Sequence, residues 1–371
     1  MKFVPLAVIL TLTGSVVFAQ QQAQQPAPQQ APQRGPQPAQ PVLLGCGSHS
    51  EGEVLCGTHS PEDLELTPDG KYLIVSQFVN GRPGGGMPGL VLFDLAKKTY
   101  TDIPITAEPR KDWGDAACSG PINEKMIPHG ISLGKRNGGS TSSNVSQLYV
   151  VNHGGRQSIE MFELKQSGAS WTLVWHGCAV TTAEFNDVAV LPDGGFIATH
   201  PTSLGQTDLF SGKPSGAVAR WTPGKGEAEL PGTQAGYPNG VLVSTDGRTM
   251  YFNAWTAKEI HRYDLKERKE TGVVKLDFMP DNITWTKDRK KMLAAGVKGA
   301  RGDCPAGSGT PCIGKFGVAE IDPAKITTTA VFDSEGKGAL ISGVSVALEV
   351  GDSIYIGAFQ GDRLVRIDRK K

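Results

Sequence analysis

The sequence predicts an all-β protein that folds as a six-bladed β-propeller with four antiparallel strands per blade. The first observation is an internal repeat: a polar pair, an alternating apolar strand, a turn and a second apolar strand recur six times. The second is the composition, because 47 Gly and 25 Pro in 371 residues are typical of a turn-rich β protein. Third, no long apolar segment has the 3.6-residue period that the crossovers of a parallel α/β sheet would need.

The six repeats follow one another along the chain. They are EDLELTPDGKYLIVS from residue 62, PHGISLGKRNGGSTSSNVSQLYVVNH from 128, NDVAVLPDGGFIATH from 186, NGVLVSTDGRTMYFNAW from 239, DNITWTKDRKKMLAAG from 281 and SGVSVALEVGDSIYIGAF from 342. Three of the turns contain Asp-Gly, which is a hairpin signal between apolar strands. The intervals leave room for two further strands each, such as GLVLFDLAKK and EIHRYDLKE, so every repeat can form a four-stranded blade.

The repeats predict a ring of polar side chains, because the first strand of each propeller blade lines the central channel. The first position of the ring holds Glu62, His129, Asn186, Asn239, Asp281 and Ser342. The second position holds Asp63, Gly130, Asp187, Gly240, Asn282 and Gly343. Carboxylates and amide oxygens that are far apart in the sequence should therefore converge at one mouth of the channel.

This ring favours a bound cation, because converging carboxylates repel each other unless positive charge lies between them. Oxygen ligands without thiolates suit Ca²⁺ or, less well, Mg²⁺ or Mn²⁺. For any single pair, an ordinary role in a turn is the simpler interpretation. Recurrence at the same phase in four of six repeats favours a metal, which could be catalytic or only a structural plug.

The first 41 residues predict two segments that precede the folded domain. Residues 1–19 combine Lys2, an apolar run and the sequence VFA before Gln20, as in a secretory signal cleaved after Ala19. The run is shorter than the ~20 apolar residues of a membrane span, although an uncut anchor is the alternative. Residues 20–41 are rich in Gln and Pro and predict a disordered linker, which leaves 42–371 for the propeller.

Export would place the six cysteines in an oxidising compartment, secreted or periplasmic, where they can form disulfides. Six cysteines allow 15 connectivities, which the sequence does not resolve. Cys304 and Cys312 flank a short loop and are the easiest local pair, and Cys46 with Cys56 is a second local candidate. Cys118 and Cys178 would then remain.

At this point several short stretches resemble the paraoxonase/arylesterase lactonases, within the wider gluconolactonase and strictosidine-synthase-like six-bladed propellers. The matching stretches, in order, are EDLEL at 62, PHGIS at 128, LYVVNH ending at 153, FNDVAV at 185, PNGV at 238 and PDNI at 280. Each is weak alone, but together they span most of residues 60–360. The resemblance implies a hydrolase that opens lactones or cleaves aryl esters.

The resemblance also implies two Ca²⁺ ions in the central channel. The catalytic ion would be held by Glu62, Asn186, Asn239, Asp281 and Asn282. The deeper, structural ion would be held by Asp63, Asp187 and the backbone carbonyl of Ile131. The disulfide that ties the first and last blades in the family has no counterpart here, because no cysteine follows Cys312. We therefore expect the propeller to close by strand pairing between the segment near LVRID and the first ordered strand.

The expected mechanism combines a metal-stabilised oxyanion with a water activated by a general base. His129 is the first candidate for the base, with His153 orienting it, and Asp281 is the rival. Trp255 and Phe359 end second strands and are expected to form walls of the substrate pocket. His200 is expected to be a wall or a substrate contact.

Two alternatives to this function remain open on the sequence. One is a sugar-lactone hydrolase of the gluconolactonase kind, and the other is a non-catalytic binding propeller with structural calcium. In each case the partner is a small molecule. A formal net charge of +0 gives no reason to expect nucleic acid or an anionic membrane as a partner, and no integral membrane segment is expected after signal cleavage.

Overall fold

A computed structural model describes most of the chain after the predicted linker. The described residues are 43–78, 87, 89–122, 126–137, 145–168, 170–181, 183–298, 315–335, 337 and 339–369. The predicted signal peptide, the predicted linker and the predicted pair Cys304 and Cys312 lie outside them. No helix among these residues is long and apolar enough to cross a membrane.

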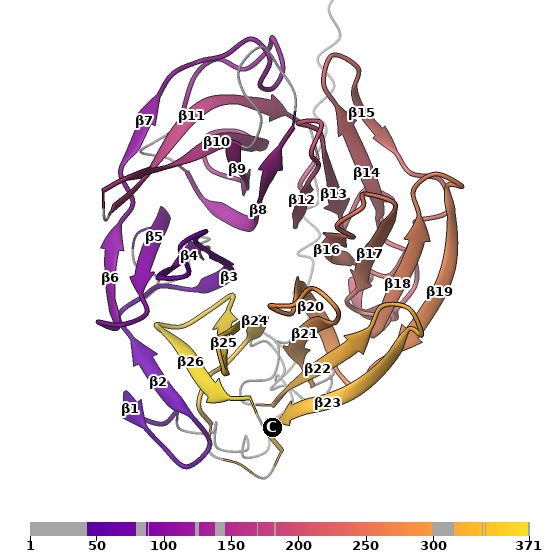
Figure 1. Cartoon of the computed structure of the whole chain (residues 1–371). Coiled ribbons are helices and arrows are strands. Elements are labelled where there is room, and N and C mark those ends of the chain that lie inside the picture. Colours follow the sequence, from indigo (N-terminus) through magenta and orange to yellow (C-terminus); the bar gives the residue numbers. More distant parts are fainter. Residues whose placement is uncertain are drawn as a thin grey trace, which may run out of the picture. The chain divides into compact units, whose positions relative to one another are not determined.

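The strands form six sheets arranged around a central axis (Figure 1). In chain order the elements are β1 (Gly47–Ser48), β2 (Glu53–Cys56), β3 (Pro61–Leu66), β4 (Tyr72–Gln77), β5 (Gly89–Asp94), β6 (Thr99–Asp102), β7 (Ile105–Ala107), β8 (Pro128–Arg136), β9 (Val145–Asn152), β10 (Ser158–Ser167), β11 (Ser170–Val180), β12 (Val188–Val190), β13 (Phe196–His200), the 3₁₀ helix η1 (Leu209–Ser211), β14 (Ala217–Thr222), β15 (Gly226–Glu229), β16 (Pro238–Val243), β17 (Thr249–Ala254), β18 (Glu259–Asp264), β19 (Lys269–Lys275), β20 (Met279–Trp285), β21 (Met292–Val297), β22 (Phe316–Asp322), β23 (Thr327–Asp333), β24 (Val344–Val350), β25 (Ser353–Ala358) and β26 (Arg363–Asp368).

The predicted six-bladed propeller is confirmed, with one predicted repeat at the inner edge of each sheet. We number the blades by their inner strands, which are β3, β8, β12, β16, β20 and β24 for blades 1 to 6. Four blades are simple four-stranded antiparallel sheets. Blade 2 gains β7, which pairs parallel to β11 outside the repeat, and blade 6 gains β1 beside β2.

The ring closes through strand pairing, as expected. β2, from the start of the described chain, pairs antiparallel with β26, so Val54 lies opposite Val365 and Leu55 opposite Leu364. The predicted disulfide between Cys46 and Cys56 spans the ends of β1 and β2. The other predicted bond, Cys118–Cys178, joins the loop before blade 2 to β11.

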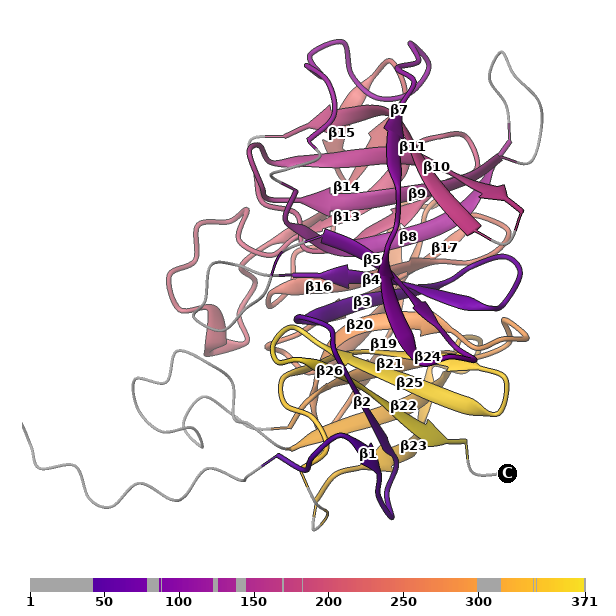
Figure 2. The same cartoon turned by 90° about the vertical axis from the view of Figure 1, so that its left-hand side faces the viewer.

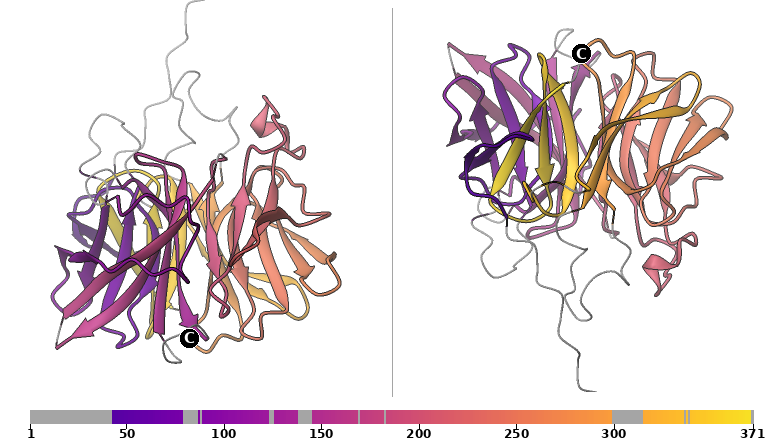
Figure 3. Two further views of the ribbon diagram at one scale, coloured as in Figure 1. Left: turned by 90° about the horizontal axis from the view of Figure 1, so that it is seen from above. Right: turned by 90° about the horizontal axis from the view of Figure 1, so that it is seen from below.

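The core consists of apolar layers between neighbouring blades. Because each sheet is covered on both faces, its central strands are apolar at consecutive positions, as in Leu73, Ile74 and Val75 of β4, which are fully buried. Burying one such side chain contributes about 1.5–3 kcal/mol. Figure 2 shows the sheets stacked side by side around the axis, and Figure 3 shows η1 projecting from one face. The blades thus form a rigid frame that holds the inner strand ends.

Candidate functional site

In four of the six blades the predicted ring residues occupy β-bulges at the starts of the inner strands. In blade 1, Pro61 pairs with Gln77 and Asp63 with Ser76, which leaves Glu62 without a partner in the ladder. The same interruption releases residues 129–130, 239–240 and 281–282 in blades 2, 4 and 5. A bulge re-aims the side chains it releases, so these residues can point into the channel.

Large and small residues alternate around the second position of the ring. The blades with odd numbers place a polar side chain there, and those with even numbers place glycine. A Cβ added to Gly130 would lie 2.2 Å from Oδ1 of Asp187, and one added to Gly240 would lie 2.5 Å from the Asp281 carbonyl oxygen. Glycine at alternate blades therefore leaves the space that three converging polar side chains occupy.

Asp63 and Asp187 connect neighbouring blades in the same way. Asp63 accepts a hydrogen bond from the N–H of Leu64 at 2.8 Å and one from the N–H of Ile131 in blade 2 at 2.7 Å. Asp187 accepts one from its own neighbour Val188 and one from Val241 in blade 4, both at 2.7 Å. Each carboxylate therefore ties two inner strands together.

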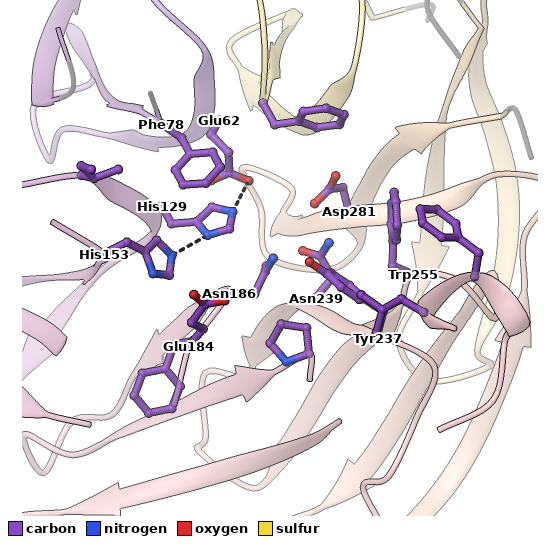
Figure 4. A pocket seen from close by; sticks show the side chains of 16 residues that line it. Glu62, Phe78, His129, His153, Glu184, Asn186, Tyr237, Asn239, Trp255 and Asp281 are labelled. Carbon is purple, nitrogen blue, oxygen red and sulfur yellow. Dashed lines mark hydrogen bonds and ion pairs between the residues drawn. The ribbon is translucent and has the colours of Figure 1, made fainter. Parts of the chain in front are cut away.

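A cavity of about 580 Å³ lies over the first ring position (Figure 4). Its polar floor and side include Glu62, His129, His153, Asn186, Asn239 and Asp281. Its walls are mostly apolar or aromatic and include Phe78, Ile127, Phe185, Pro201, Leu209, Phe210, Tyr237, Trp255 and Phe359. The structure therefore brings two of the three expected wall residues, Trp255 and Phe359, to the cavity.

His200, the third expected wall residue, does not line the cavity. Its ring packs against Phe185, with 4.0 Å between the centroids, and its Nε2 lies 2.7 Å from Oε1 of Glu227. The strand register gives the reason. Ile131 of blade 2 pairs with Val150, and its counterpart in blade 3, Val188, pairs with Ala198. His153 comes three residues after Val150, and Pro201 comes three residues after Ala198. Pro201 is thus the counterpart of His153, and a one-residue offset turns a side chain to the other face of a strand.

Four buried oxygen atoms of the ring have no hydrogen-bond partner among the described residues. They are Oε2 of Glu62 and the Oδ1 atoms of Asn186, Asn239 and Asn282. Each residue is at most 4% exposed, and the four come from blades 1, 3, 4 and 5. An unsatisfied buried acceptor costs on the order of 1–3 kcal/mol, so this arrangement favours the binding of a positively charged ligand.

The pKa values of the ring carboxyls are raised above their usual range. Burial raises the pKa of Asp63 to about 7 and that of Asp281 to about 8. Burial, and then the charges of Asp63, Asp281 and Asp187, raise the pKa of Glu62 well above its usual value. Burial and Asp63 act in the same direction on the pKa of Asp187. Without positive charge nearby, these groups tend to hold protons.

Residues that could hold a cation are therefore present, but they are not a cluster of acidic side chains alone. Within the described ranges, no three His, Cys, Asp or Glu side chains form a group that could hold a metal ion. The first ring position offers two carboxylates, Glu62 and Asp281, and the amide oxygens of Asn186 and Asn239, which have no hydrogen-bond partner among the described residues. Amide oxygens are ordinary ligands for Ca²⁺, which binds six to eight oxygen atoms.

His129 and His153 form a hydrogen-bonded pair at the side of the cavity (Figure 4). Nδ1 of His129 lies 3.0 Å from Nε2 of His153, and Nδ1 of His153 lies 2.7 Å from Oε1 of Gln157. Burial lowers the pKa of both imidazoles, and the charge of His153 lowers that of His129 further. Both rings are therefore expected to be neutral near pH 7.

The partners of this pair assign its tautomers. The oxygen of Gln157 only accepts, so Nδ1 of His153 donates to it. Nε2 of His153 then accepts from the Nδ1–H of His129, and the lone pair of His129 remains on Nε2. That atom lies 3.8 Å from Oε1 of Glu62, and Phe78 stacks on the ring at 4.1 Å. The arrangement presents an unprotonated nitrogen beside the ring of oxygen atoms.

Several residues at this site were not identified from the sequence, among them Phe78, Gln157, Glu184 and Tyr237. Phe78 and Tyr237 carry a weak signal, because Phe78 follows the second strand of blade 1 as His153 follows that of blade 2, and Tyr237 comes before the PNG stretch. Gln157 and Glu184 lie in loops, where no repeat position marks them.

Comparison with known proteins supports the expected relationship. The family model described as the SMP-30/gluconolactonase/LRE-like region matches residues 124–295, from just before blade 2 into β21 of blade 5. Serum paraoxonase/arylesterase 1 of Mus musculus is 27% identical over 246 residues, and serum paraoxonase/lactonase 3 of the same species is 25% identical over 233. The predicted resemblance to the lactonase-type propellers is confirmed.

The extent of these matches is limited. Each of the two alignments covers 60% of this chain and 62% of the mouse protein, so the chain spans less than two thirds of the relatives it matches. Among solved structures, a gluconolactonase from Xanthomonas campestris is 15% identical, with a TM-score of 0.49, and covers 91% of this chain and 99% of its own.

Proposed function

We propose that the protein is a calcium-dependent hydrolase that opens lactones or cleaves aryl esters. One observation carries the proposal: four buried oxygen atoms from four blades have no hydrogen-bond partner among the described residues, and three of them belong to Glu62, Asn186 and Asn239, which line a cavity that also presents a neutral histidine pair. A divalent cation would satisfy these oxygens and offset the repulsion between Glu62 and Asp281. The names of the two mouse relatives, arylesterase and lactonase, agree with this chemistry.

The proposed ligands of the catalytic ion are Glu62, Asn186, Asn239, Asp281 and Asn282. The proposed ligands of a second, deeper ion are Asp63, Asp187 and the carbonyl oxygen of Ile131. The raised pKa values of Asp63 and Asp187 support the second ion, since nearby positive charge is what would let both ionise. Because each of these two carboxylates already bridges two strands, the deeper ion would be mainly structural.

The chain's own residues would supply base catalysis and positioning. A bound calcium ion would supply Lewis acidity toward the carbonyl group of the substrate. His129 would take a proton from water on Nε2, the nitrogen that its hydrogen bond to His153 leaves unprotonated. The Glu62 carboxylate, 3.8 Å away, would stabilise the resulting imidazolium. Asp281 remains the alternative base.

The walls of the cavity favour lipophilic substrates. Apolar and aromatic side chains surround the polar floor, and a polyhydroxylated sugar would leave its hydroxyl groups without partners against them. We therefore rank aliphatic lactones and aryl esters first. A sugar-lactone hydrolase is the second candidate, because the matching family model carries the gluconolactonase description.

Matched asparagine and aspartate variants test the proposal. Asn186→Ala and Asp281→Ala should each lower both calcium affinity and the hydrolysis of a lactone and a phenyl ester, by at least about tenfold. Asn137→Ala, at an exposed asparagine away from the cavity, should change neither. Hydrolysis that survives in the Asn186→Ala/Asp281→Ala double variant would contradict a metal-dependent site. A protein that binds calcium but turns over no substrate would support the non-catalytic propeller.

Export through a signal cleaved after Ala19 is part of the proposal. The disulfides Cys46–Cys56 and Cys118–Cys178 fit an oxidising, extracellular compartment. N-terminal sequencing of the mature protein should begin at Gln20, and a chain that retains Lys2 would contradict cleavage.

A further inference from the structure

One wall of the cavity is an aromatic corner made of Phe210, Tyr237 and Trp255. The rings of Tyr237 and Trp255 are 5.3 Å apart between centroids, at 52° to each other, and those of Phe210 and Trp255 are 5.5 Å apart at 60°. Three rings at steep angles form a concave surface instead of a stack. The negative faces of aromatic rings attract cations.

The backbone holds this corner in a fixed and costly conformation. Tyr237 has φ of 55°, in the left-handed region, immediately before Pro238. Its N–H donates to Oγ of Ser215 at 2.9 Å, and its carbonyl accepts from the N–H of Trp255 at 3.1 Å. A non-glycine residue in the left-handed region is strained, and such residues gather at ligand sites. The conformation presets the ring before any ligand arrives.

The charge around the corner is negative. The exposed carboxylate Glu184 lines the cavity on the side that faces Tyr237 (Figure 4). No Lys or Arg is found among the described residues that line the cavity.

We propose that the aromatic corner and Glu184 form a subsite for an organic cation, such as an ammonium group. The rings would contact the apolar surface of the cation, and Glu184 would offset its charge from across the cavity. An anionic group beside the corner would face Glu184 without a Lys or Arg among the described lining residues to offset its charge. The identification of the cation as part of a hydrolysed ester or lactone rests on the proposed function. The binding of an organic cation at this subsite is independent of that function.

Binding of a matched pair of ligands tests the subsite without any turnover. Choline and its neutral isostere 3,3-dimethylbutan-1-ol differ in the replacement of N⁺ by carbon. Tryptophan fluorescence or saturation-transfer NMR should show that choline binds roughly 3- to 30-fold more tightly. Equal or tighter binding of the neutral alcohol would overturn the proposal and leave a purely hydrophobic wall.

Variants identify the groups responsible. Glu184→Gln, at an exposed position, should reduce the preference for choline about threefold or more, and Trp255→Leu should reduce it further. Tyr237→Phe should retain it because the ring remains. Glu267→Gln, which removes the same charge at an exposed turn between β18 and β19, should have no effect. A preference that is unchanged in both Glu184→Gln and Trp255→Leu would overturn the assignment.

The acetate esters of the two alcohols separate this inference from the proposed function. Faster hydrolysis of the cationic ester, lost in Glu184→Gln, supports both. Hydrolysis of lactones and esters with no preference for the cation contradicts the subsite and leaves the proposed function standing. Selective choline binding with no hydrolysis of any substrate supports the subsite and contradicts the proposed function.

Discussion

Removing calcium should make the stability of the protein depend steeply on pH. The buried carboxyl of Asp63 has a pKa of about 7 in the folded chain against its usual 3.8, and Asp281 has a pKa of about 8. Between pH 4 and these values the folded chain holds protons that the unfolded chain has released. The free energy of unfolding of the metal-free protein must therefore fall as pH rises through this range.

The magnitude follows from the raised pKa of a single group. One pKa unit corresponds to 1.36 kcal/mol, so a pKa raised from 3.8 to about 7 costs on the order of 4 kcal/mol once Asp63 is ionised in the folded chain. That loss is a large part of a typical stability of about 5–15 kcal/mol. The ring carboxyls interact with one another, so their separate losses are not summed.

Urea unfolding at pH 5, 6, 7 and 8, with chelator and with excess calcium, measures the effect. The chelated protein should lose several kcal/mol between pH 5 and 8, while the calcium-loaded protein should lose much less. Glu65 supplies an internal control, because burial raises its pKa to about 8 although it is not a proposed ligand. Glu65→Gln should remove the decrease in unfolding free energy with rising pH that remains in the calcium-loaded protein. Equal stability of the chelated protein at pH 5 and pH 8 would refute the reasoning.

Three further changes should have distinct effects. Asp187→Ala leaves the N–H groups of Val188 and Val241 unpaired, so urea unfolding should show a loss of about 2–6 kcal/mol; an unchanged midpoint would contradict the bridging role. Asn186→Ala removes an unsatisfied oxygen, so it should lower calcium affinity in dialysis with little loss of metal-free stability; the reverse ordering of these two variants would mean that the two ions are assigned wrongly. Removing the Cys118–Cys178 bond, which spans 60 residues, should cost about 4 kcal/mol in the same unfolding assay, and a cost near zero would mean that neighbouring contacts alone hold the loop.

The closure by β26 was predicted from the lack of a cysteine after Cys312 and from the family resemblance. The sequence repeat alone was enough to predict the blade plan and the order of the ring residues. These features depend on periodicity and on position within a repeat, and both are visible in a single sequence. Glu62, Asn186 and Asp281 could be aligned because each lies within a few residues of the start of the inner strand of its blade.

Other features depend on details that a repeat does not carry. The sequence did not decide whether His200 or Pro201 faces the cavity, because the register of β13 is needed to tell on which face each side chain lies. Gln157 orients His153 from a turn, and Glu184 reaches the cavity from a loop, so neither has a counterpart in the other blades. The parallel pairing of β7 with β11 involves a connection outside the repeat altogether.

The central claim is that calcium at the channel mouth enables hydrolysis. The most direct measurement is the metal content of the purified protein, combined with hydrolysis of a panel of aliphatic lactones, sugar lactones and phenyl esters with and without chelator. We expect bound calcium, loss of hydrolysis on chelation and recovery when calcium is returned. Undiminished turnover by a protein shown to be free of metal would contradict it.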